Sequence, residues 1–312
     1  MSQSPLKHIT RRQFLGRAAV ATASIALFSD CQSVFTQKKV KTATDLITLG
    51  KSGIKVSRLG MGTGTNGGRI QREMGQKAFT AMIRHGIERG VTFIDTADNY
   101  NEMHEMVREA IKRLDREKLQ IQCKIPGSKY DDPLKELDRF RFEVGTDYFD
   151  SFLLHHAHTP DWPEKEKRMQ DLLEEAKHRQ IIRSHGVSIH GMPALNAADR
   201  ATPWIDVAFV RVNHNGRHMD GAEGKFGAPG LRDQALLKIE KMHREGKGII
   251  GMKLIGNGDF TERRDRIESI QFAMSLDYVD AAVIGFKSPQ EIDEAIATIN
   301  AAFAGASDRR SS

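Results

Sequence analysis

The chain has 312 residues, 39% of them hydrophobic, so it is long enough to bury a full core in one large domain or two smaller ones. Its formal net charge is +6, but the charge is unevenly distributed. Residues 1–41 hold seven Lys or Arg and one acid, which leaves 40 basic and 40 acidic side chains for the remainder, 47 less 7 and 41 less 1. A neutral body excludes a broad electrostatic surface for nucleic acid.

The basic N-terminal segment has an order of its own. Arg11 and Arg12 precede an apolar run that ends at Phe28 and is too short to span a bilayer as a settled helix. This order resembles a twin-arginine export signal, which a receptor reads and which carries folded proteins across the inner membrane. We therefore expect a signal peptide over residues 1–31, the twin-arginine export machinery as a partner, and a periplasmic or otherwise exported protein. A disordered basic tail is the alternative.

The two cysteines bear on anchoring and on disulfides. Cys31 stands where a lipoprotein cysteine would, although the residues directly before it lack the small side chain that such sites favour. A lipid anchor at Cys31 is therefore a hypothesis, and we expect contact with a membrane only through this anchor or the signal. If Cys31 leaves with the signal, Cys123 is the one remaining cysteine, and the mature chain has no internal disulfide.

After a polar linker, expected over residues 32–44, short apolar runs alternate with longer segments of helical period. The runs are rich in Val, Ile and Phe, which is typical of strands. They are RLGMGT (58–63), VTFID (91–95), LQIQCK (119–124), FDSFLLHH (149–156), SHGVSIH (184–190), DVAFVRVN (206–213), GIIGMKLIG (248–256) and DAAVIGF (280–286). Eight strands separated by helices predict a single (α/β)8 TIM barrel over residues 45–303, followed by a disordered tail over 304–312. A doubly wound open sheet is the alternative.

Three segments between these runs have the spacing of helices with one buried stripe. Their apolar positions are Met103, Met106, Val107, Ala110, Ile111 and Leu114, then Met169, Leu172, Leu173 and Ala176, then Leu236, Leu237, Ile239 and Met242. Pro163 suits the first turn of the second helix, and we expect the methionines to be core residues. Ahead of the first barrel strand, DLITLGKSGIKVSRLG predicts a hairpin that caps the bottom of the barrel.

Chemistry in such a barrel gathers where the strands end at their carboxyl side. Asp95 ends the second run, Tyr100 follows it in FIDTADNY, Lys124 ends the third run and His155 lies at the end of the fourth. A lysine ammonium about 4 to 6 Å from a phenol lowers its pKa from about 10, and a buried aspartate keeps the lysine charged. The histidine donates a hydrogen bond to a carbonyl oxygen or assists the proton transfer. Together the four predict a unit that protonates a developing alkoxide, as hydride transfer to a carbonyl requires.

Blander interpretations remain open for single residues of this unit. Asp95 could simply cap the end of a strand, and Lys124 could be a surface lysine. His155 could be a core histidine whose hydrogen bonds are made within the protein. His155 is the preferred histidine, with His156 and His158 as alternatives. We expect Asp98 to be only a turn residue.

Several motifs in this order resemble the aldo-keto reductase family over roughly residues 46–300. They are FIDTADNY, Lys124 placed 24 residues after Tyr100, DYFDSFLLHH, ITLGKSGIKVSRLGMGT, GVS at 186–188, GIIGMKLIG and VIGFKSPQEIDEA. The resemblance implies an (α/β)8 barrel, a catalytic tetrad of Asp95, Tyr100, Lys124 and His155, and a nicotinamide cofactor. It also implies hydride transfer between that cofactor and a small-molecule carbonyl or alcohol, with Tyr100 as general acid and base.

The resemblance also carries four residues to the cofactor: Ser188, Lys287, Ser288 and Thr63. Lys287 and Ser288 open the last helix, where charge and the helix N-terminus both favour phosphate. This part of the sequence nevertheless departs from the family pattern.

The departures concern the carboxamide and the adenosine ribose. Ile189 stands where the family usually has Asn, and Phe209 stands where it usually has Gln. If Asp293 faces the ribose, it disfavours a phosphorylated cofactor. The family default is NADP(H), and this sequence leaves NAD(H) open as well.

A second set of side chains suggests a different chemistry. The histidines of HHAH, together with His185, His190, His214 and His218, offer imidazole ligands for a metal on the barrel rim. A metal-dependent barrel enzyme is therefore one alternative function, and a non-catalytic nicotinamide-binding barrel is another. Since Asp95 is the one obvious carboxylate at a matching strand end, we expect no metal.

The segment 213–230 is long, rich in Gly and polar, as a loop that covers a substrate would be. Arg217, His218 and Asp220 either face a polar or acidic substrate or only solvate the loop. The identity of the substrate does not follow from these residues.

Overall fold

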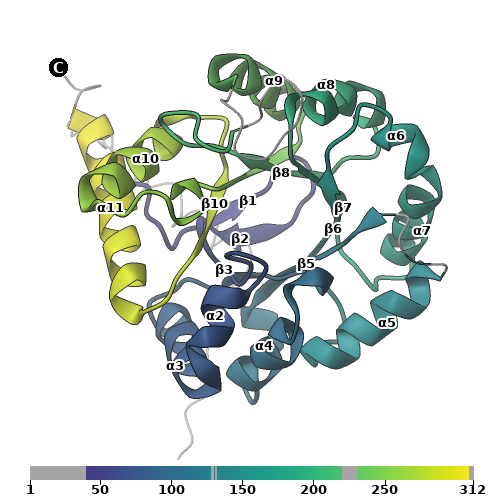
Figure 1. The fold of residues 1–312 in the computed structure, drawn as a ribbon, viewed down its shortest axis with the longest axis horizontal. Coiled ribbons are helices and arrows are strands. Elements are labelled where there is room, and N and C mark those ends of the chain that lie inside the picture. Colours follow the sequence, from purple (N-terminus) through teal and green to yellow (C-terminus); the bar gives the residue numbers. More distant parts are fainter. Residues whose placement is uncertain (1–39, 128–129, 131, 220–230, 309–312) are drawn as a thin grey trace, which may run out of the picture. The chain divides into compact units, whose positions relative to one another are not determined.

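The computed structural model describes residues 40–308 apart from 128, 129, 131 and 220–230. Within these residues, eight parallel strands close a barrel in the order β3-β4-β5-β6-β7-β8-β9-β10, and β10 pairs again with β3. Figure 1 shows the helices as a ring around the strands. The (α/β)8 TIM barrel is thus confirmed and the open sheet is excluded. The expected signal peptide (1–31) and Asp220 lie outside the described residues.

Each barrel strand overlaps the apolar run that predicted it. The strands are β3 (Leu59–Gly62), β4 (Phe93–Asp95), β5 (Gln120–Ile125), β6 (Ser151–Ala157), β7 (His185–Ile189), β8 (Val207–Arg211), β9 (Gly248–Met252) and β10 (Ala281–Gly285). Apart from His156 and Gly285, every residue of these strands is buried, because helices cover the outer face and side chains fill the inside. Most strand residues are therefore apolar, although β5 also buries Gln120, Gln122 and Lys124.

The helices occupy the segments between the strands. They are α2 (Arg69–Glu73), α3 (Gly75–Glu88), α4 (Met103–Ile111), α5 (Pro133–Val144), α6 (Trp162–Lys165), α7 (Lys167–His178), α8 (Met192–Ala201), α9 (Arg232–Arg244), α10 (Arg263–Ser275) and α11 (Pro289–Asp308), with short 3-10 turns η1 (Asp98–Tyr100), η2 (Arg116–Lys118) and η4 (Gly256–Gly258). In the part of the chain that the structure describes, no helix has both the length and the apolar character needed to cross a bilayer. The four methionines expected in the core are buried there.

Three local expectations differ from the structure. Leu237 is 66% exposed. Successive helix residues are rotated by about 100°, so Leu237 lies on the face of α9 opposite the buried Ala235 and Ile239. Pro163 lies in the first turn of the separate short helix α6, not of α7, since the chain leaves helical geometry at Glu166 before α7 starts. Helix α11 continues to Asp308, beyond residue 303, over an Ala-rich stretch that favours helix.

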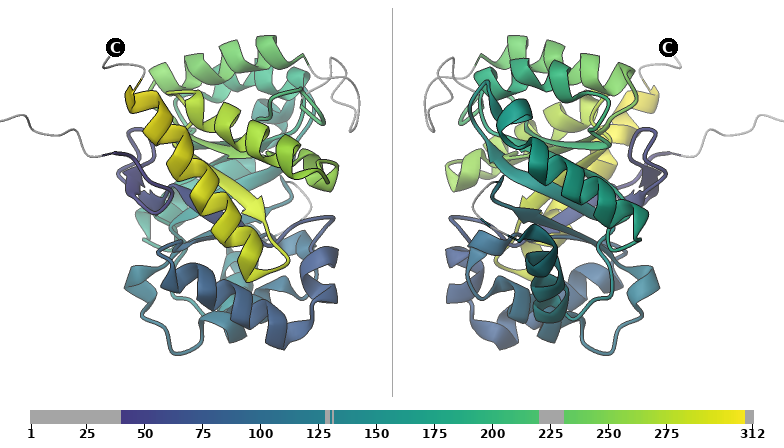
Figure 2. Two further views of the ribbon diagram at one scale, coloured as in Figure 1. Left: turned by 90° about the vertical axis from the view of Figure 1, so that its left-hand side faces the viewer. Right: turned by 90° about the vertical axis from the view of Figure 1, so that its right-hand side faces the viewer.

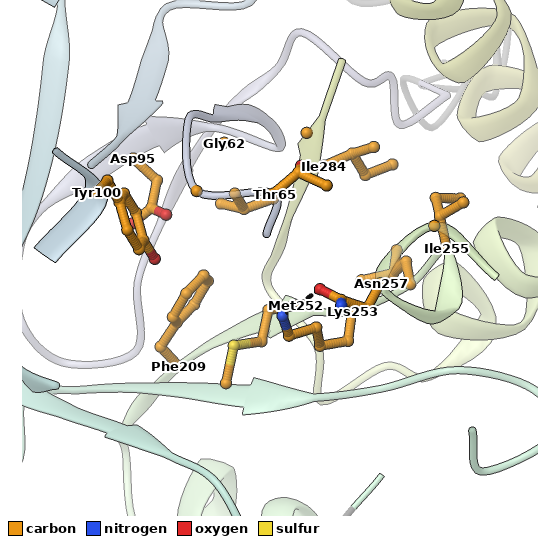
Figure 3. Close-up of a pocket in the computed structure, with 15 residues that line it drawn as sticks. Gly62, Thr65, Asp95, Tyr100, Phe209, Met252, Lys253, Ile255, Asn257 and Ile284 are labelled. Atoms are coloured by element: carbon orange, nitrogen blue, oxygen red, sulfur yellow. Dashed lines mark hydrogen bonds between the residues drawn. The ribbon is translucent and has the colours of Figure 1, made fainter. Parts of the chain in front are cut away.

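A hairpin of β1 (Leu46–Thr48) and β2 (Lys55–Ser57) closes the N-terminal end of the barrel. The backbone N–H of Lys51 donates to the Gly246 carbonyl at 2.7 Å, which joins the turn to the segment before β9. Leu49 is fully buried among the side chains that fill the barrel. The side views in Figure 2 place this hairpin at one end of the barrel. The opposite end carries a cavity of about 130 Å3, drawn in Figure 3.

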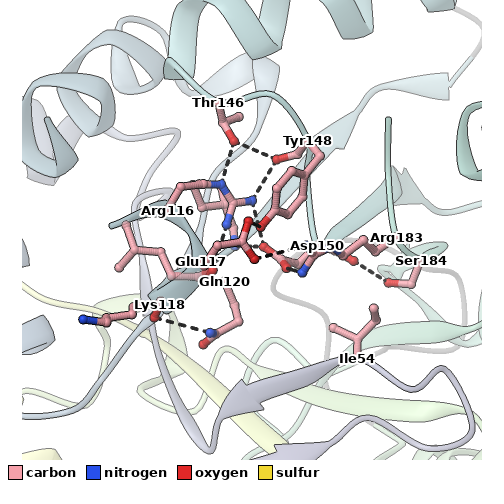
Figure 4. Close-up of polar contacts among 12 residues, drawn as sticks. Ile54, Arg116, Glu117, Lys118, Gln120, Thr146, Tyr148, Asp150, Arg183 and Ser184 are labelled. Carbon is pink, nitrogen blue, oxygen red and sulfur yellow. Dashed lines mark hydrogen bonds and ion pairs between the residues drawn. The ribbon is translucent and has the colours of Figure 1, made fainter. Parts of the chain in front are cut away.

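A buried carboxylate organises the closed end of the barrel next to β5 and β6 (Figure 4). Asp150 is 3% exposed and accepts hydrogen bonds from Arg116 Nη2 at 2.9 Å, Arg183 Nη1 at 3.2 Å and the Ile121 N–H at 2.9 Å. Both guanidinium groups also stack on the ring of Tyr148, with their central carbons 4.0 and 3.9 Å from its centroid. One carboxylate thus joins the segments before β5, β6 and β7.

Replacing Asp150 by Asn keeps its shape but leaves two guanidinium groups without their counter-charge. Removing one partner of a buried ion pair costs about 3 to 5 kcal/mol. Because the Arg116 and Arg183 side chains remain 20% and 44% exposed, we expect a loss of about 2 to 3 kcal/mol in the free energy of unfolding, measured by urea denaturation. Asp171→Asn, which removes an exposed pair with Lys167, should cost less than about 0.5 kcal/mol. Equal small losses in both variants would contradict this role for Asp150.

Candidate active site

An ion pair buried inside the barrel lies at the centre of the site. Lys124 on β5 is fully buried, and its ammonium donates to Asp95 Oδ1 at the end of β4 and, at 2.8 Å, to the carbonyl of Thr96. Gln122, two residues earlier on the same face of β5, donates to the same Asp95 oxygen at 2.7 Å. Burial lowers the pKa of Lys124, and the Asp95 carboxylate opposes that change. The aspartate therefore keeps a cation inside the barrel.

Tyr100 lies on η1, directly after β4, and faces this pair. Lys124 Nζ is 5.1 Å from the centroid of the phenol ring, inside the expected range. Burial nevertheless raises the pKa of Tyr100 well above 10, and the Asp95 carboxylate raises it further. The expected lowering of this pKa is therefore absent, because Asp95 compensates the charge of Lys124 and the phenolate has no water around it. At neutral pH Tyr100 is a protonated phenol.

The loop that carries Tyr100 is attached to α5. Asp98 accepts a hydrogen bond from Arg139 Nη2 at 2.9 Å and another from the Tyr130 hydroxyl. Its side chain is 8% exposed. Asp98 is thus more than a turn residue, since these bonds hold η1 and with it the catalytic phenol.

A polar cluster lies behind Lys124, on the outer face of β5. Cys123 is fully buried, and its sulfur is 3.5 Å from His104 Nε2, while His104 Nδ1 is 2.8 Å from Glu143 Oε2. Burial by itself lowers the pKa of His104, but the Cys123 sulfur and the Glu143 carboxylate raise it to about 10. This imidazolium joins α4, α5 and β5 on the side away from the cavity.

His155 completes the set of four expected residues. Its ring meets that of Tyr100 edge to face, with centroids 5.6 Å apart. Burial, the neighbouring His156 and the positive charge of Lys124 together lower the pKa of His155 well below 6.5, so the imidazole is neutral. Among the residues that the structure describes, neither ring nitrogen has a hydrogen-bond partner, and Nδ1 is buried. A neutral imidazole with this geometry suits a carbonyl oxygen placed next to the phenol.

The cavity beside Tyr100 has the features that a nicotinamide nucleotide needs. In Figure 3, Tyr100 lies on one side, Lys253 and Asn257 lie on the other, and Phe209 and Met252 form an apolar wall between them. Such a wall suits a flat ring, and the Lys253 ammonium suits a phosphate. These residues therefore fit the expected cofactor, although Phe209 offers no amide for its carboxamide.

Glycines keep this cavity open. A Cβ atom on Gly64 would overlap the ring of Tyr100, and a Cβ atom on Gly285 would overlap the hydroxyl of Thr65. Side chains at either position would therefore close the space next to the catalytic phenol.

Two residues expected to hold the cofactor lie outside the lining of this cavity. Thr63 is fully buried, and its hydroxyl donates to the Asp95 carbonyl at 3.0 Å. Ser188 is also fully buried, with its hydroxyl 3.1 Å from His190 Nε2. In the structure Thr63 connects the end of β3 to β4, and Ser188 contacts the residue that follows β7.

The start of α11 is already capped by its own residues. The Ser288 hydroxyl accepts the Glu291 N–H at 3.3 Å, and the Glu291 carboxylate accepts the Lys287 N–H at 2.9 Å. A carboxylate therefore lies where we expected a phosphate, with the exposed Lys287 ammonium 4.0 Å from it. The assignment of Lys287 and Ser288 to the cofactor stays a prediction.

Asp293 forms ion pairs with α3, whereas we had considered a contact with the adenosine ribose. Its Oδ1 lies 3.1 Å from both His85 Nε2 and Arg89 Nε of α3. The carboxylate is therefore engaged between α11 and α3, and it gives no reason to disfavour a 2′-phosphate.

Several residues in or next to the cavity were not predicted from the sequence. The run 62–67, GTGTNG, has the G-x-G-x-x-G spacing of a dinucleotide-binding loop, and three of its residues border the cavity: Gly62, Gly64 and Thr65. Lys253 directly follows β9, and Asp95 and Lys124 likewise lie at or near the ends of their strands. Its position at a strand end was therefore the signal that could have found it. Gln122 was recognisable as the residue that shares a face with Lys124.

Three of the histidines proposed as metal ligands gather at the barrel rim. Ring nitrogens of His155, His156 and His190 lie within 4.8 Å of one another. However, His190 Nδ1 already accepts a hydrogen bond from Arg211 Nη2 at 2.9 Å. Burial lowers the pKa of His156, and the positive charges of Lys124 and Arg211 contribute to the lowering. A second cation is disfavoured in such surroundings.

The other proposed ligands serve elsewhere. His185 Nε2 is 2.8 Å from Glu174 Oε2 and its ring stacks on Trp204. His214 packs against Phe260 with ring centroids 5.1 Å apart. The structure does not bring these imidazoles to the cluster at the rim.

The described part of the loop after β8 is attached to the loop after β9. Arg217 Nε and His218 Nε2 lie 2.7 and 2.8 Å from the same Asp259 oxygen. These two side chains therefore form ion pairs with Asp259. We had considered only a contact with the substrate or with solvent.

Comparison with known sequences identifies relatives of the chain. A profile described as the Aldo/keto reductase family matches residues 58–272. A soybean (Glycine max) protein named probable aldo-keto reductase 1 is 38% identical over 84 residues, which is 25% of this chain and 23% of that protein. The chain thus spans about a quarter of the length of this relative.

Solved structures share the fold. A Pseudomonas aeruginosa protein assigned as an aldo-keto reductase has a TM-score of 0.67 and 23% identity, with 84% of this chain and 98% of that chain covered. An aldo-keto reductase from Klebsiella pneumoniae in complex with NADPH has a TM-score of 0.61 and 18% identity, with 82% and 89% covered. At these identities the likeness shows the fold, and because the family profile covers more than half of the chain, the protein belongs to the aldo/keto reductase family.

Proposed function

We propose that the protein is a nicotinamide-dependent oxidoreductase that interconverts a small carbonyl compound and its alcohol. One observation carries the proposal: a protonated phenol, a buried ammonium and a neutral imidazole converge at one end of a cavity with an apolar wall. Membership of the aldo/keto reductase family supports it. The relative from Klebsiella pneumoniae was solved with NADPH, which supports NADP(H) for this chain, while the Glu291 carboxylate at the start of α11 keeps NAD(H) open.

Each side chain of the site has a distinct part in this reaction. The bound nicotinamide supplies or accepts the hydride. Tyr100 donates its proton to the substrate oxygen as negative charge develops there, and the His155 N–H stabilises the same oxygen. The Lys124 ammonium stabilises the phenolate that Tyr100 becomes. Asp95 acts through Lys124, whose charge and orientation it maintains.

A metal-dependent enzyme is the second candidate, and the cluster of His155, His156 and His190 is the observation that favours it. The neighbouring positive charges of Arg211 and Lys124 weigh against it. Stoichiometric zinc or iron in the purified protein would reverse this preference. A barrel that binds nucleotide without turnover would show NADPH affinity but no reaction with any aldehyde, ketone or keto-sugar.

Tyr100→Phe removes the proposed acid and little else. We expect kcat to fall about 100- to 10,000-fold, because general acid catalysis contributes an effect of that size, while NADPH affinity changes only a few-fold. Absorbance near ~340 nm with a panel of carbonyl compounds measures the rate, and fluorescence titration measures the affinity. Tyr278→Phe makes the same chemical change shortly before β10, away from the cavity, and should leave both unchanged. An unchanged rate in Tyr100→Phe would remove the proposed acid.

The raised pKa of Tyr100 predicts opposite pH profiles for the two directions of the reaction. Reduction uses the phenol, which is fully populated below its raised pKa, so kcat/KM for carbonyl reduction should stay level from about pH 6 to pH 9. Alcohol oxidation uses the phenolate, whose fraction grows about tenfold per pH unit in that range, so its kcat/KM should rise. Lys124→Met should depress oxidation more than reduction, since it removes the charge that stabilises the phenolate. A reduction profile that falls between pH 6 and pH 8 would contradict this assignment.

We also propose that residues 1–31 form a twin-arginine signal and that the enzyme works outside the cytoplasm. The paired arginines, the apolar run after them and the neutral remainder of the chain support this. Export of an enzyme that needs a nicotinamide supports a further step, in which the protein folds around its cofactor before it crosses the membrane.

Changing both Arg11 and Arg12 to Lys keeps the charge of the leader but removes the paired arginines. We expect the active protein to move from the periplasmic to the cytoplasmic fraction, measured by enzyme activity and immunoblot after fractionation. Unchanged export of the double variant would contradict the signal. Radioactive fatty acid on the exported protein, lost in Cys31→Ser, would support the lipid anchor at Cys31.

A further inference from the structure

A second cavity, of about 440 Å3, is lined by His155, which does not line the proposed cofactor cavity. It is bordered by His155, His156, His158 and Lys165, with Trp162 as an apolar wall. Neither Tyr100 nor any residue of β9 lines it, so it is separate from the cavity that fits a nucleotide. Tyr100 thus lines the first cavity and His155 lines the second, and their rings meet edge to face.

Among the titratable side chains that line this second cavity, four are His or Lys and one is an acid. The His155 and His156 ring centroids are 3.7 Å apart, and those of His156 and His190 are 4.4 Å apart. In the described ranges, no carboxylate forms an ion pair with His155, His156 or His158. Glu166 is the one acid in its lining, and it lies against the Gly127 backbone.

Cations behind the cavity reinforce this charge. Burial and the neighbouring His158, together with the positive charges of Lys124, Lys253 and Arg211, lower the pKa of His156 to about 4. Burial and the charges of Arg211 and Lys124 also lower the pKa of Lys253 to about 8, and its ammonium donates to the neutral amide of Asn257 at 2.6 Å. Positive charges around a site disfavour the binding of a further proton and favour the binding of an anion.

The backbone at His156 provides an independent observation. Its φ is +60°, in the left-handed region that residues with a Cβ rarely adopt, and the pairing of β6 with β7 shifts register between Leu154 and Ala157. Among the residues of β6, His156 is the exposed one. Such a conformation persists where the surrounding structure imposes it, and it turns this imidazole into the cavity next to His155.

From this geometry we propose that the substrate carries an anionic group, a carboxylate on a short oxo acid or hydroxy acid, and that His156 and Lys165 bind it in the second cavity. The carbonyl oxygen then lies between His155 and Tyr100. This inference rests on the proposed oxidoreductase function and names its substrate class. The phosphates of the cofactor have the same charge and are the competing occupant.

A binding experiment that needs no turnover tests the anion site. Succinate and the neutral succinamide are titrated calorimetrically into the full protein, with and without saturating NADP+. We expect succinate to bind at least about tenfold more tightly than succinamide, with proton uptake and with equal affinity whether or not NADP+ is present. Equal affinity for the two compounds would overturn the proposal. Loss of succinate binding in the presence of NADP+ would also overturn it, because the site would then belong to the cofactor.

Variants assign the anion site to particular side chains. His156→Gln and Lys165→Gln should each weaken succinate binding at least about threefold and leave succinamide unchanged. Lys167→Gln removes a lysine of the same region that lies outside the cavity and pairs with Asp171, and it should change neither affinity. Equal losses in all three variants would show only a general effect of charge and would overturn the assignment.

Kinetics separate this inference from the function on which it rests. We expect kcat/KM for 4-oxobutanoate to exceed that for its methyl ester by at least about tenfold, and the ratio to fall in His156→Gln. If the ester reacts as well as the acid, the oxidoreductase stands and the substrate class is wrong. If neither compound reacts and NADPH does not bind, the proposed function itself fails, while the binding experiment still decides whether the anion site exists.

Discussion

The catalytic end of this barrel depends on one buried ion pair. An ammonium as deeply buried as that of Lys124 is stable only next to a compensating charge, and Asp95 supplies it from the neighbouring strand. The pair in turn decides the state of its neighbours: the carboxylate helps to keep Tyr100 protonated, and the ammonium helps to keep His155 neutral. One interaction thus contributes to the protonation states of both the phenol and the imidazole.

The two ends of the barrel solve different physical problems. At the closed end, the hairpin fills the opening and Asp150 satisfies two guanidinium groups, so the charges there are paired. At the open end, basic groups accumulate with few acids, and glycines replace side chains next to the phenol. The stabilising ion pairs thus lie at the end of the barrel where no ligand binds. The cavities and the basic groups without acidic partners lie at the end where a ligand can bind.

The strands and the four central residues were predictable because they follow from local patterns. Apolar runs of the right length mark buried strands, and the rule that chemistry follows strand ends located Asp95, Lys124 and His155. The pKa of Tyr100 was not predictable, since it depends on burial and on where the Asp95 carboxylate lies. Nor was the engagement of Thr63 and Ser188 inside the barrel, because spacing along a strand does not say which hydrogen bonds a side chain makes. Lys253 was missed although the strand-end rule applies to it.

The buried Cys123 has a consequence for how the molecule moves. Its side chain points out of the barrel, next in sequence to Lys124, and α4, α5 and His104 cover it completely. A thiol in that position can meet a reagent from solution only when these helices separate from β5. The rate at which a reagent modifies Cys123 therefore measures how often the structure around Lys124 opens. No engineered label is required.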